Sequence, residues 1–244
     1  MFLSFLFLYL HHNSTCDSMT QHEKAKAHAA LVRDHILQVK EHVAGMILNL
    51  GIKSVRMDDV AADLGMSKRT LYEMFGDKEE LLYQSIVYLM EERQRELTKR
   101  TAHCQNMLET LLVSVRMLCI EGRMGELERR LTANMKKFYP QILERVQNFH
   151  IERSMSGLRY ALDKCREDGY LDPNADIELM TQLFFLSTGM LISDGRVVMP
   201  DGVSREEAFG ALVVNFLRGL SSSKGLMMID QFLERERSQK QNEE

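Results

Sequence analysis

The sequence predicts an all-α protein. Only three of its 244 residues are prolines, and hardly any segment alternates apolar and polar residues in the way that is typical of a β-strand. Instead, apolar residues recur at spacings of three and four, which places them on one face of successive helices. With 45% hydrophobic and 27% charged residues, the composition is ordinary for a globular protein. The net charge of -4 indicates no particular class of partner.

The first eighteen residues differ from the rest of the chain. They open with an apolar run, but no Lys or Arg precedes it, no small-residue cleavage site follows it, and it is too short to span a bilayer. We expect translation to begin at Met19, which makes 1–18 an upstream extension; otherwise 1–18 would form a disordered arm. An interfacial anchor and an ordered arm are the alternatives.

No metal or cofactor site is predicted. His28, His35 and His42 recur every seven residues, but neighbours two helical turns apart lie about 10 Å from each other, too far to share one ion. We interpret them as a solvated stripe. The cysteines show no C-x-x-C pair and are expected to be free thiols in a reducing cytoplasm. They are Cys16, Cys104, Cys119 and Cys165.

A short amphipathic helix is predicted shortly after Gly51. Its apolar positions follow the i, i+3, i+4, i+7 rule and are Met57, Val60, Ala61 and Leu64. Gly65 comes next and can adopt the left-handed conformation that ends a helix. Arg56 stands where a Ser or Thr cap is usual. Either Ser54 caps a longer start, or the helix begins uncapped at a cost of about 1 kcal/mol.

A second helix begins at Ser67, whose hydroxyl is expected to cap it. Three apolar residues of this helix are predicted to be buried: Leu71, Met74 and Phe75. The opposite face then carries Lys68, Arg69, Tyr72 and Glu73. Asp77 and Glu80 form a capping pattern that starts a third, long helix with Lys78 in its first turn. Two short helices joined by a glycine turn form a helix-turn-helix, and cations at the start of the second suit a DNA major groove.

The stretch LGMSKRTLYEMFGDKEEL is similar to the signature of the tetracycline-repressor (TetR, AcrR-like) family of transcriptional regulators. The resemblance covers roughly 36–82 and departs from the family at the cap position and at Ile47, where a long aromatic is usual. It implies DNA contacts from the second helix of the motif and from Lys78, and it places Phe75 in the core. The predicted DNA-binding residues are Arg56, Ser67, Lys68, Arg69, Thr70, Tyr72 and Lys78.

Charge within 19–80 is balanced, with nine basic and ten acidic residues. The domain has no bulk basic surface, so the DNA contact must be local. We therefore expect only a few phosphate contacts per subunit and a correspondingly shallow salt dependence.

The remaining sequence predicts successive amphipathic helices. They cover about 77–98, 102–121, 124–134, 140–168, 177–191, 204–220 and 224–236, followed by a polar tail over 237–244 that is expected to fray. Pro140 suits a first helical turn, and Ser204 with Glu207 predicts a capping box.

The two most apolar of these helices, 177–191 and 204–220, either bury each other or bury a partner. The resemblance implies a four-helix bundle across a two-fold axis, and a dimer lets two modules read a palindrome. We expect a homodimer. The predicted interface residues are Phe185, Met190, Phe209, Leu212, Val213 and Phe216.

Many of the seventeen methionines lie in the same C-terminal region. Methionine fills irregular gaps in a core and also lines adaptable binding surfaces. The resemblance implies an effector pocket among these helices. The predicted ligand-binding residues are Met117, Tyr160, Met180, Gln182, Phe184, Ser187 and Thr188.

The sequence thus predicts a DNA-binding domain over 19–80 and a helical ligand-binding and dimerisation domain over 81–236. The expected function is a cytoplasmic transcriptional regulator, a repressor whose homodimer binds a palindromic double-stranded operator and is released by a small molecule, without a membrane partner. The sequence contains no Gly-rich phosphate loop, no Glu-x-x-His pair and no serine elbow, so no motif in it predicts an enzyme. The alternative is a helical enzyme or interaction module with a vestigial DNA motif, which the uncapped position at Arg56 favours.

Overall fold

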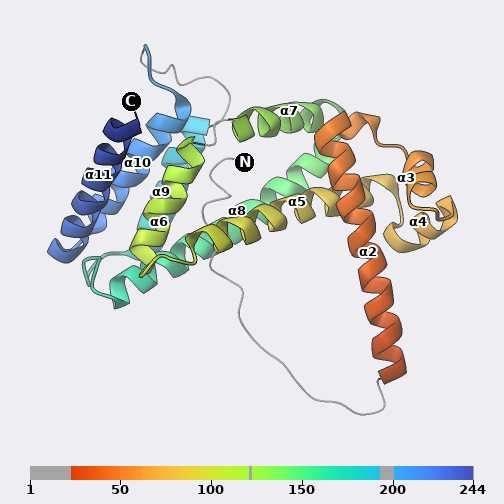
Figure 1. Ribbon diagram of the computed structural model, residues 1–244, viewed down its shortest axis with the longest axis horizontal. Helices are drawn as coiled ribbons and strands as arrows, with labels where there is room; N and C mark the ends of the chain where they lie inside the picture. Colours follow the sequence, from red (N-terminus) through yellow and green to blue (C-terminus); the bar gives the residue numbers. More distant parts are fainter. Residues whose placement is uncertain (1–22, 121–122, 193–200, 244) are drawn as a thin grey trace. The chain divides into compact units, whose positions relative to one another are not determined.

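The computed structural model describes residues 23–120, 123–192 and 201–243, with side-chain environments for most of them (Figure 1). Within these ranges the regular structure consists of ten α-helices, one 3-10 turn and an isolated bridge between Leu171 and Ser221. The predicted all-α class is therefore confirmed. The predicted extension over 1–18 lies outside the described residues.

The chain divides into two compact units. In described residues, the N-terminal unit comprises 23–93 and 126–149, and the C-terminal unit comprises 94–120, 123–125, 150–192 and 201–243. The N-terminal unit is larger than the predicted 19–80 domain because it includes the first turns of two long helices, α5 (Lys78–Thr101) and α8 (Pro140–Glu167). A compact unit is not necessarily a domain that folds independently, so the boundaries 19–80 and 81–236 stay predictions.

The N-terminal unit is built on α2 (Glu23–Leu50), which leads through η2 (Ile52–Ser54) to α3 (Met57–Asp63) and α4 (Lys68–Phe75). Every fourth residue of α2 from Val39 to Ile47 is buried, which gives the helix one apolar face. Ile47 is almost fully buried although it is smaller than the usual aromatic. All but the first three residues of α7 (Arg123–Phe138) and the start of α8 also belong to this unit.

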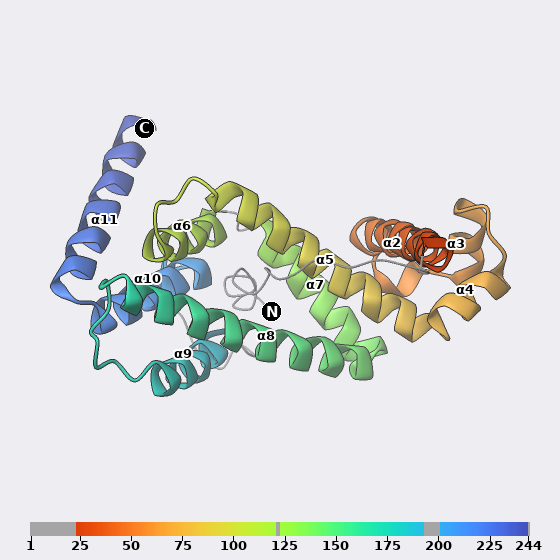
Figure 2. The ribbon, with the colours of Figure 1, turned by 90° about the horizontal axis from the view of Figure 1, so that it is seen from below.

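The C-terminal unit contains α6 (Met107–Ile120), α9 (Ile177–Ile192), α10 (Arg205–Leu220) and α11 (Ser223–Glu243). Helix α10 packs against α6, α9 and α11, and α6, α10 and α11 lie side by side in both ribbon views (Figures 1 and 2). The rings of Phe184 and Phe216 join α9 to α10 at a centroid distance of 4.7 Å.

Several helix ends differ from the predicted ones. Helix α6 begins five residues later than expected because the side chain of Asn106 caps it, accepting from the N–H of Glu109 at 3.0 Å. The prediction of a frayed tail over 237–244 is wrong as far as Glu243, since α11 continues through it. That segment contains good helix formers such as Glu, Gln and Lys, and no Gly or Pro interrupts it.

A clasp joins two loops of the C-terminal unit, 168–172 between α8 and α9 and 220–225 between α10 and α11. Backbone N–H groups donate from Asp172 to Leu220 (2.8 Å) and from Ser222 to Tyr170 (3.0 Å). The ammonium of Lys224 donates to the carbonyl of Asp168 (2.7 Å) and lies 4.1 Å from the centroid of the Tyr170 ring. The clasp therefore fixes the start of α11 against the end of α8.

No helix among the described residues has the length and apolarity needed to cross a bilayer.

Candidate nucleic-acid interface

Helices α3 and α4 are joined by a turn whose geometry follows from two residues. Gly65 has φ +62°, a left-handed conformation that costs glycine little, and it ends α3 as predicted. Ser67 then caps α4, because its Oγ accepts from the N–H of Thr70 at 3.0 Å. The start of α3 has no such cap. Arg56 is at the N-cap without a side-chain hydrogen bond and Ser54 belongs to η2, so the uncapped alternative holds.

Two faces of α4 have opposite environments. Leu71 and Phe75 are buried, as predicted, whereas the predicted burial of Met74 is only partial. The ring of Tyr72 is on the other face with 42% of its surface exposed. The side chain of Arg69 is 87% exposed. Helix α4 therefore presents a phenol and a guanidinium to solvent while its apolar residues hold it against the unit.

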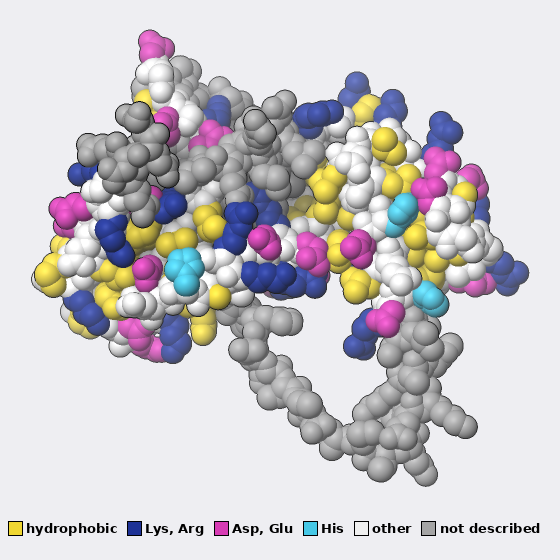
Figure 3. Space-filling model, viewed as in Figure 1, with side chains coloured by type: hydrophobic (Ala, Val, Ile, Leu, Met, Phe, Trp, Pro, Cys, Tyr) yellow, Lys and Arg dark blue, Asp and Glu magenta, His cyan; other side chains and the backbone are white. Residues whose placement is uncertain are grey.

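Both cations of α4 have acidic neighbours. Lys68 Nζ lies 2.9 Å from a carboxylate oxygen of Asp58, and this hydrogen bond raises the pKa of the ammonium. Arg69 pairs with Glu73 at 2.8 Å within the helix. These side chains remain in solvent, where ion pairs contribute little and are readily exchanged. On the face that Figure 3 shows, cations and acids are mixed over the region of α3 and α4.

Helix α5 starts next to this motif. Asp77 Oδ1 accepts from the N–H of Glu80 at 2.8 Å, which confirms the predicted cap. The carboxylate of Glu80 is engaged elsewhere, by Gln84 at 2.9 Å and by Arg145 at 2.8 Å. Burial by itself would raise the pKa of Glu80, but these hydrogen bonds outweigh it and lower that pKa. Lys78, in the first turn, is partly buried beside Tyr139.

We expect replacement of Ser67 by alanine to reduce the free energy of unfolding by about 1 kcal/mol, because the N–H of Thr70 loses its only side-chain acceptor. Ser67→Asp is the matched control, since aspartate caps as well but puts a negative charge near DNA. It should retain stability and weaken DNA binding. Urea denaturation followed by circular dichroism measures the first effect, and equal stability of the alanine variant and the wild type would contradict the capping role.

The predicted ligand-binding residues lie on α6, α8 and α9 and are not gathered around one described cavity. Their environments are mixed: Phe184 and Thr188 are buried, Met117 and Met180 are half-buried, and Tyr160, Gln182 and Ser187 are exposed. The hydroxyls of Ser187 and Thr188 donate to carbonyls one turn earlier in α9. These two side chains are therefore already satisfied within their own helix. Their role in binding a ligand stays a prediction.

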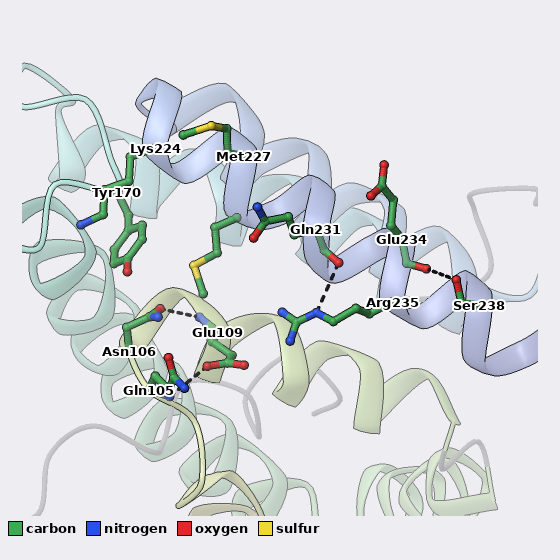
Figure 4. Close-up of a pocket in the computed structure, with 11 residues that line it drawn as sticks. Gln105, Asn106, Glu109, Tyr170, Lys224, Met227, Gln231, Glu234, Arg235 and Ser238 are labelled. Atoms are coloured by element: carbon green, nitrogen blue, oxygen red, sulfur yellow. Dashed lines mark hydrogen bonds between the residues drawn. The ribbon is translucent and has the colours of Figure 1, made fainter.

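A groove of about 1010 Å³ lies between the start of α6 and α11, away from those residues (Figure 4). Asn106 and Glu109 line one side, and Met227, Gln231 and Arg235 of α11 line the other. The groove is open and its lining mixes both signs of charge. It does not have the apolar enclosure that small-molecule sites usually show.

Sequence reasoning missed two buried polar side chains. Within the described part of the chain, both amide atoms of Gln94 on α5 and the hydroxyl of Thr181 on α9 are buried without a hydrogen-bond partner. An unsatisfied buried polar group costs about 1–3 kcal/mol, so such groups are unusual unless something else satisfies them. No motif marks these positions, because burial depends on packing between distant helices.

The predicted dimer residues also divide by environment. Phe209 and Val213 are buried inside their own unit on α10, while Phe185, Leu212 and Phe216 are half-buried. The side chain of Met190 lies outside the described residues. A different set on α9 is exposed: Leu179, Leu183 and Leu186, at i, i+4 and i+7. The spacing of these three leucines can be read from the sequence, but α9 has so many other apolar residues that the spacing alone did not single them out.

The described residues contain no cluster of His, Cys, Asp and Glu side chains that could hold a metal. His42 instead pairs with Asp63 at 3.0 Å, which links α2 to α3. The thiols of Cys104 and Cys165 are free. Burial raises the pKa of both and takes that of Cys165 to about 12, so this thiol stays protonated at neutral pH.

Comparison with known proteins agrees with this geometry. Residues 49–84, which include the whole helix-turn-helix, match the family model of bacterial regulatory proteins of the tetR family. Residues 49–84 therefore carry the helix-turn-helix of the tetR family. No curated protein matches the chain.

Solved structures share the fold over a larger part of the chain. A protein assigned to this family from Mesorhizobium loti is 21% identical with a TM-score of 0.52, over 79% of this chain and 98% of its own. One from Rhodococcus sp. is 20% identical with a TM-score of 0.53, over 78% and 98%. SmeT, solved in complex with triclosan, is 18% identical with a TM-score of 0.51, over 79% and 93%. These matches show a shared TetR-family fold.

Proposed function

We propose that this chain is a ligand-responsive transcriptional repressor that binds a palindromic DNA operator as a homodimer. The observation that carries the proposal is the exposed face of α4, where the Ser67 cap, Arg69 and Tyr72 point to solvent from a helix held by Leu71 and Phe75. A major groove admits such a helix, and donors near its start reach phosphates and base edges.

Dimerisation is supported by the exposed face of α9. Leu179, Leu183 and Leu186 form one apolar stripe, and the last of them is 67% exposed. Exposed contiguous apolar surface usually marks an interaction site. Phe185 and Met190 flank this stripe in sequence, whereas the burial of Phe209 and Val213 leaves them little surface for a partner. We therefore propose a two-fold contact centred on α9 with the half-buried face of α10.

A small-molecule effector is supported by the buried unpaired groups of Gln94 and Thr181. All the polar side chains that are buried in the described part of the chain are uncharged or imidazole. A charged ligand group would need a buried counter-charge there. We therefore expect an uncharged, largely apolar effector that offers hydrogen-bonding groups. SmeT, whose fold is similar, was solved in complex with the small molecule triclosan, and we extend only the general idea of a small ligand to this chain.

Selection of duplexes from a random pool on the full-length protein tests the function. We expect an enriched palindrome whose half-sites are about one or two helical turns apart, since each subunit presents one α4. Enrichment of a single asymmetric half-site would contradict binding as a homodimer. Absence of any enrichment would favour the interaction module with a vestigial motif.

We expect Leu186→Glu to convert the dimer into a monomer at micromolar concentration, because two buried carboxylates would face each other across the two-fold axis. Sedimentation velocity measures the change. Ile151→Glu is the matched control, since Ile151 is also exposed but belongs to α8. A Leu186→Glu chain that sediments like the wild type would show that the α9 stripe is not the interface.

A further inference from the structure

Tyr139 is the single residue between α7 and α8. It precedes Pro140, and the residue before a proline is disfavoured in the helical conformation, so α7 ends here. The N–H of Tyr139 still donates to the carbonyl of Met135 (2.8 Å), and its own carbonyl accepts from the N–H of Leu143 (3.1 Å). The backbone is therefore held on both sides, which fixes the point from which the phenol ring projects.

Three contacts join this junction to the first two turns of α5. The ammonium of Lys78 lies 5.8 Å from the centroid of the Tyr139 ring. The guanidinium of Arg145 donates to Glu80 at 2.8 Å and stacks on the ring of Tyr83 at 3.9 Å. All of these residues belong to the N-terminal unit. The start of α8 thus holds the segment of α5 that directly follows the helix-turn-helix.

The neighbouring ring contacts the chain on the other side of the motif. Phe138 has the ammonium of Lys53 4.7 Å from its centroid, and that of Lys137 at 5.2 Å. Lys53 belongs to η2, which directly precedes the motif, and Lys78 directly follows it. The two adjacent rings therefore contact a lysine at each end of the helix-turn-helix.

The chemistry of these contacts suits a DNA-binding lysine. An aromatic face attracts an ammonium through its quadrupole but carries no net charge. Lys78 is thus restrained without being neutralised, in contrast to Lys68, which is paired with a carboxylate of Asp58. A restrained cation loses less side-chain entropy when it binds a phosphate.

We propose that Tyr139 is a positioning residue that holds the ammonium of Lys78 where it reaches a DNA phosphate, with Arg145 fixing the same turns of α5. This role rests on the proposed function, since it requires that Lys78 contacts DNA. It assigns a part in DNA binding to the junction of α7 and α8, which lies about sixty residues beyond the motif in sequence.

A double-mutant cycle tests the link. The probe is a duplex selected from a random pool on the wild-type chain. Tyr139→Leu should weaken binding about two- to fivefold, the range expected for one exposed ammonium and ring pair, while Tyr139→Phe, which keeps the ring, should bind like the wild type. In a Lys78→Met background, Tyr139→Leu should cause no further loss. In a Lys99→Met background, which removes an exposed charge from the far end of α5, the full loss should remain.

Hydrogen exchange provides a readout that needs no DNA. Amides over 78–84 should exchange faster in Tyr139→Leu than in Tyr139→Phe. Equal exchange in the two variants would overturn the contact, and additive affinity losses with Lys78→Met would overturn the positioning of that lysine. If the wild-type chain enriches no duplex, the proposed function is wrong and the positioning role falls with it, whereas the exchange data still report on the contact.

Discussion

Tyr72→Ala is expected to abolish specific retention of operator DNA in a gel-shift assay while the dimer stays folded. The phenol is on the exposed face of α4, one turn beyond the Ser67 cap, where its hydroxyl can donate to a phosphate. A hydrogen bond to a charged group contributes about 1.5–3 kcal/mol. A dimer has two such residues, so the affinity should fall by on the order of a hundredfold or more.

The stability of the Tyr72→Ala chain should change little, because exposed side chains away from caps and cores usually alter unfolding by under about 0.5 kcal/mol. Tyr72→Phe separates the hydroxyl from the ring. If the hydroxyl donates to a phosphate, the phenylalanine variant loses most of the affinity as well. Unchanged retention by Tyr72→Ala, with the same duplex and salt concentration, would remove Tyr72 from the interface.

The helix-turn-helix could be predicted because its determinants are local. Gly65 ends α3 through its own backbone conformation, and Ser67 caps α4 through an amide three residues away. The spacing of Leu71 and Phe75 then decides which face is buried. None of these features depends on a distant part of the chain, so the sequence was sufficient to predict that Arg69 and Tyr72 are exposed.

The C-terminal unit was less predictable because amphipathic helices specify a buried face but not a partner. Phe209 and Val213 lie on the apolar face of α10, as expected, yet that face packs inside the unit, against helices that include α6. The contact of Arg145 with Glu80 joins residues that are 65 positions apart. The break between helices at Tyr139 can be read from the sequence, since Pro140 follows it. The contact of its ring with Lys78 cannot, because that contact depends on the packing of α8 beside α5.

Gly225→Ala is expected to lower the free energy of unfolding by about 3 kcal/mol. Gly225 is in the first turn of α11, inside the clasp, and an added Cβ would lie deep within the van der Waals radius of the Tyr170 carbonyl oxygen and 3.0 Å from the Ser221 side chain. That carbonyl cannot move freely, because it accepts from the N–H of Ser222. The overlap and the loss of clasp hydrogen bonds both contribute to the effect.

Thermal unfolding followed by circular dichroism measures this effect, and about 3 kcal/mol corresponds to a fall in Tm of about 6–12 °C for a chain of this size. Gly219→Ala is the matched control, because Gly219 is near the end of α10 and nothing lies within 4 Å of an added Cβ. Alanine is favoured over glycine in a helix by up to about 1 kcal/mol, so this variant should be as stable as the wild type or more so. Opposite signs for two identical substitutions, six positions apart, would locate the constraint in the clasp. If the Gly225→Ala chain has the same Tm as the wild type, the loop between α8 and α9 moves to accommodate the added Cβ.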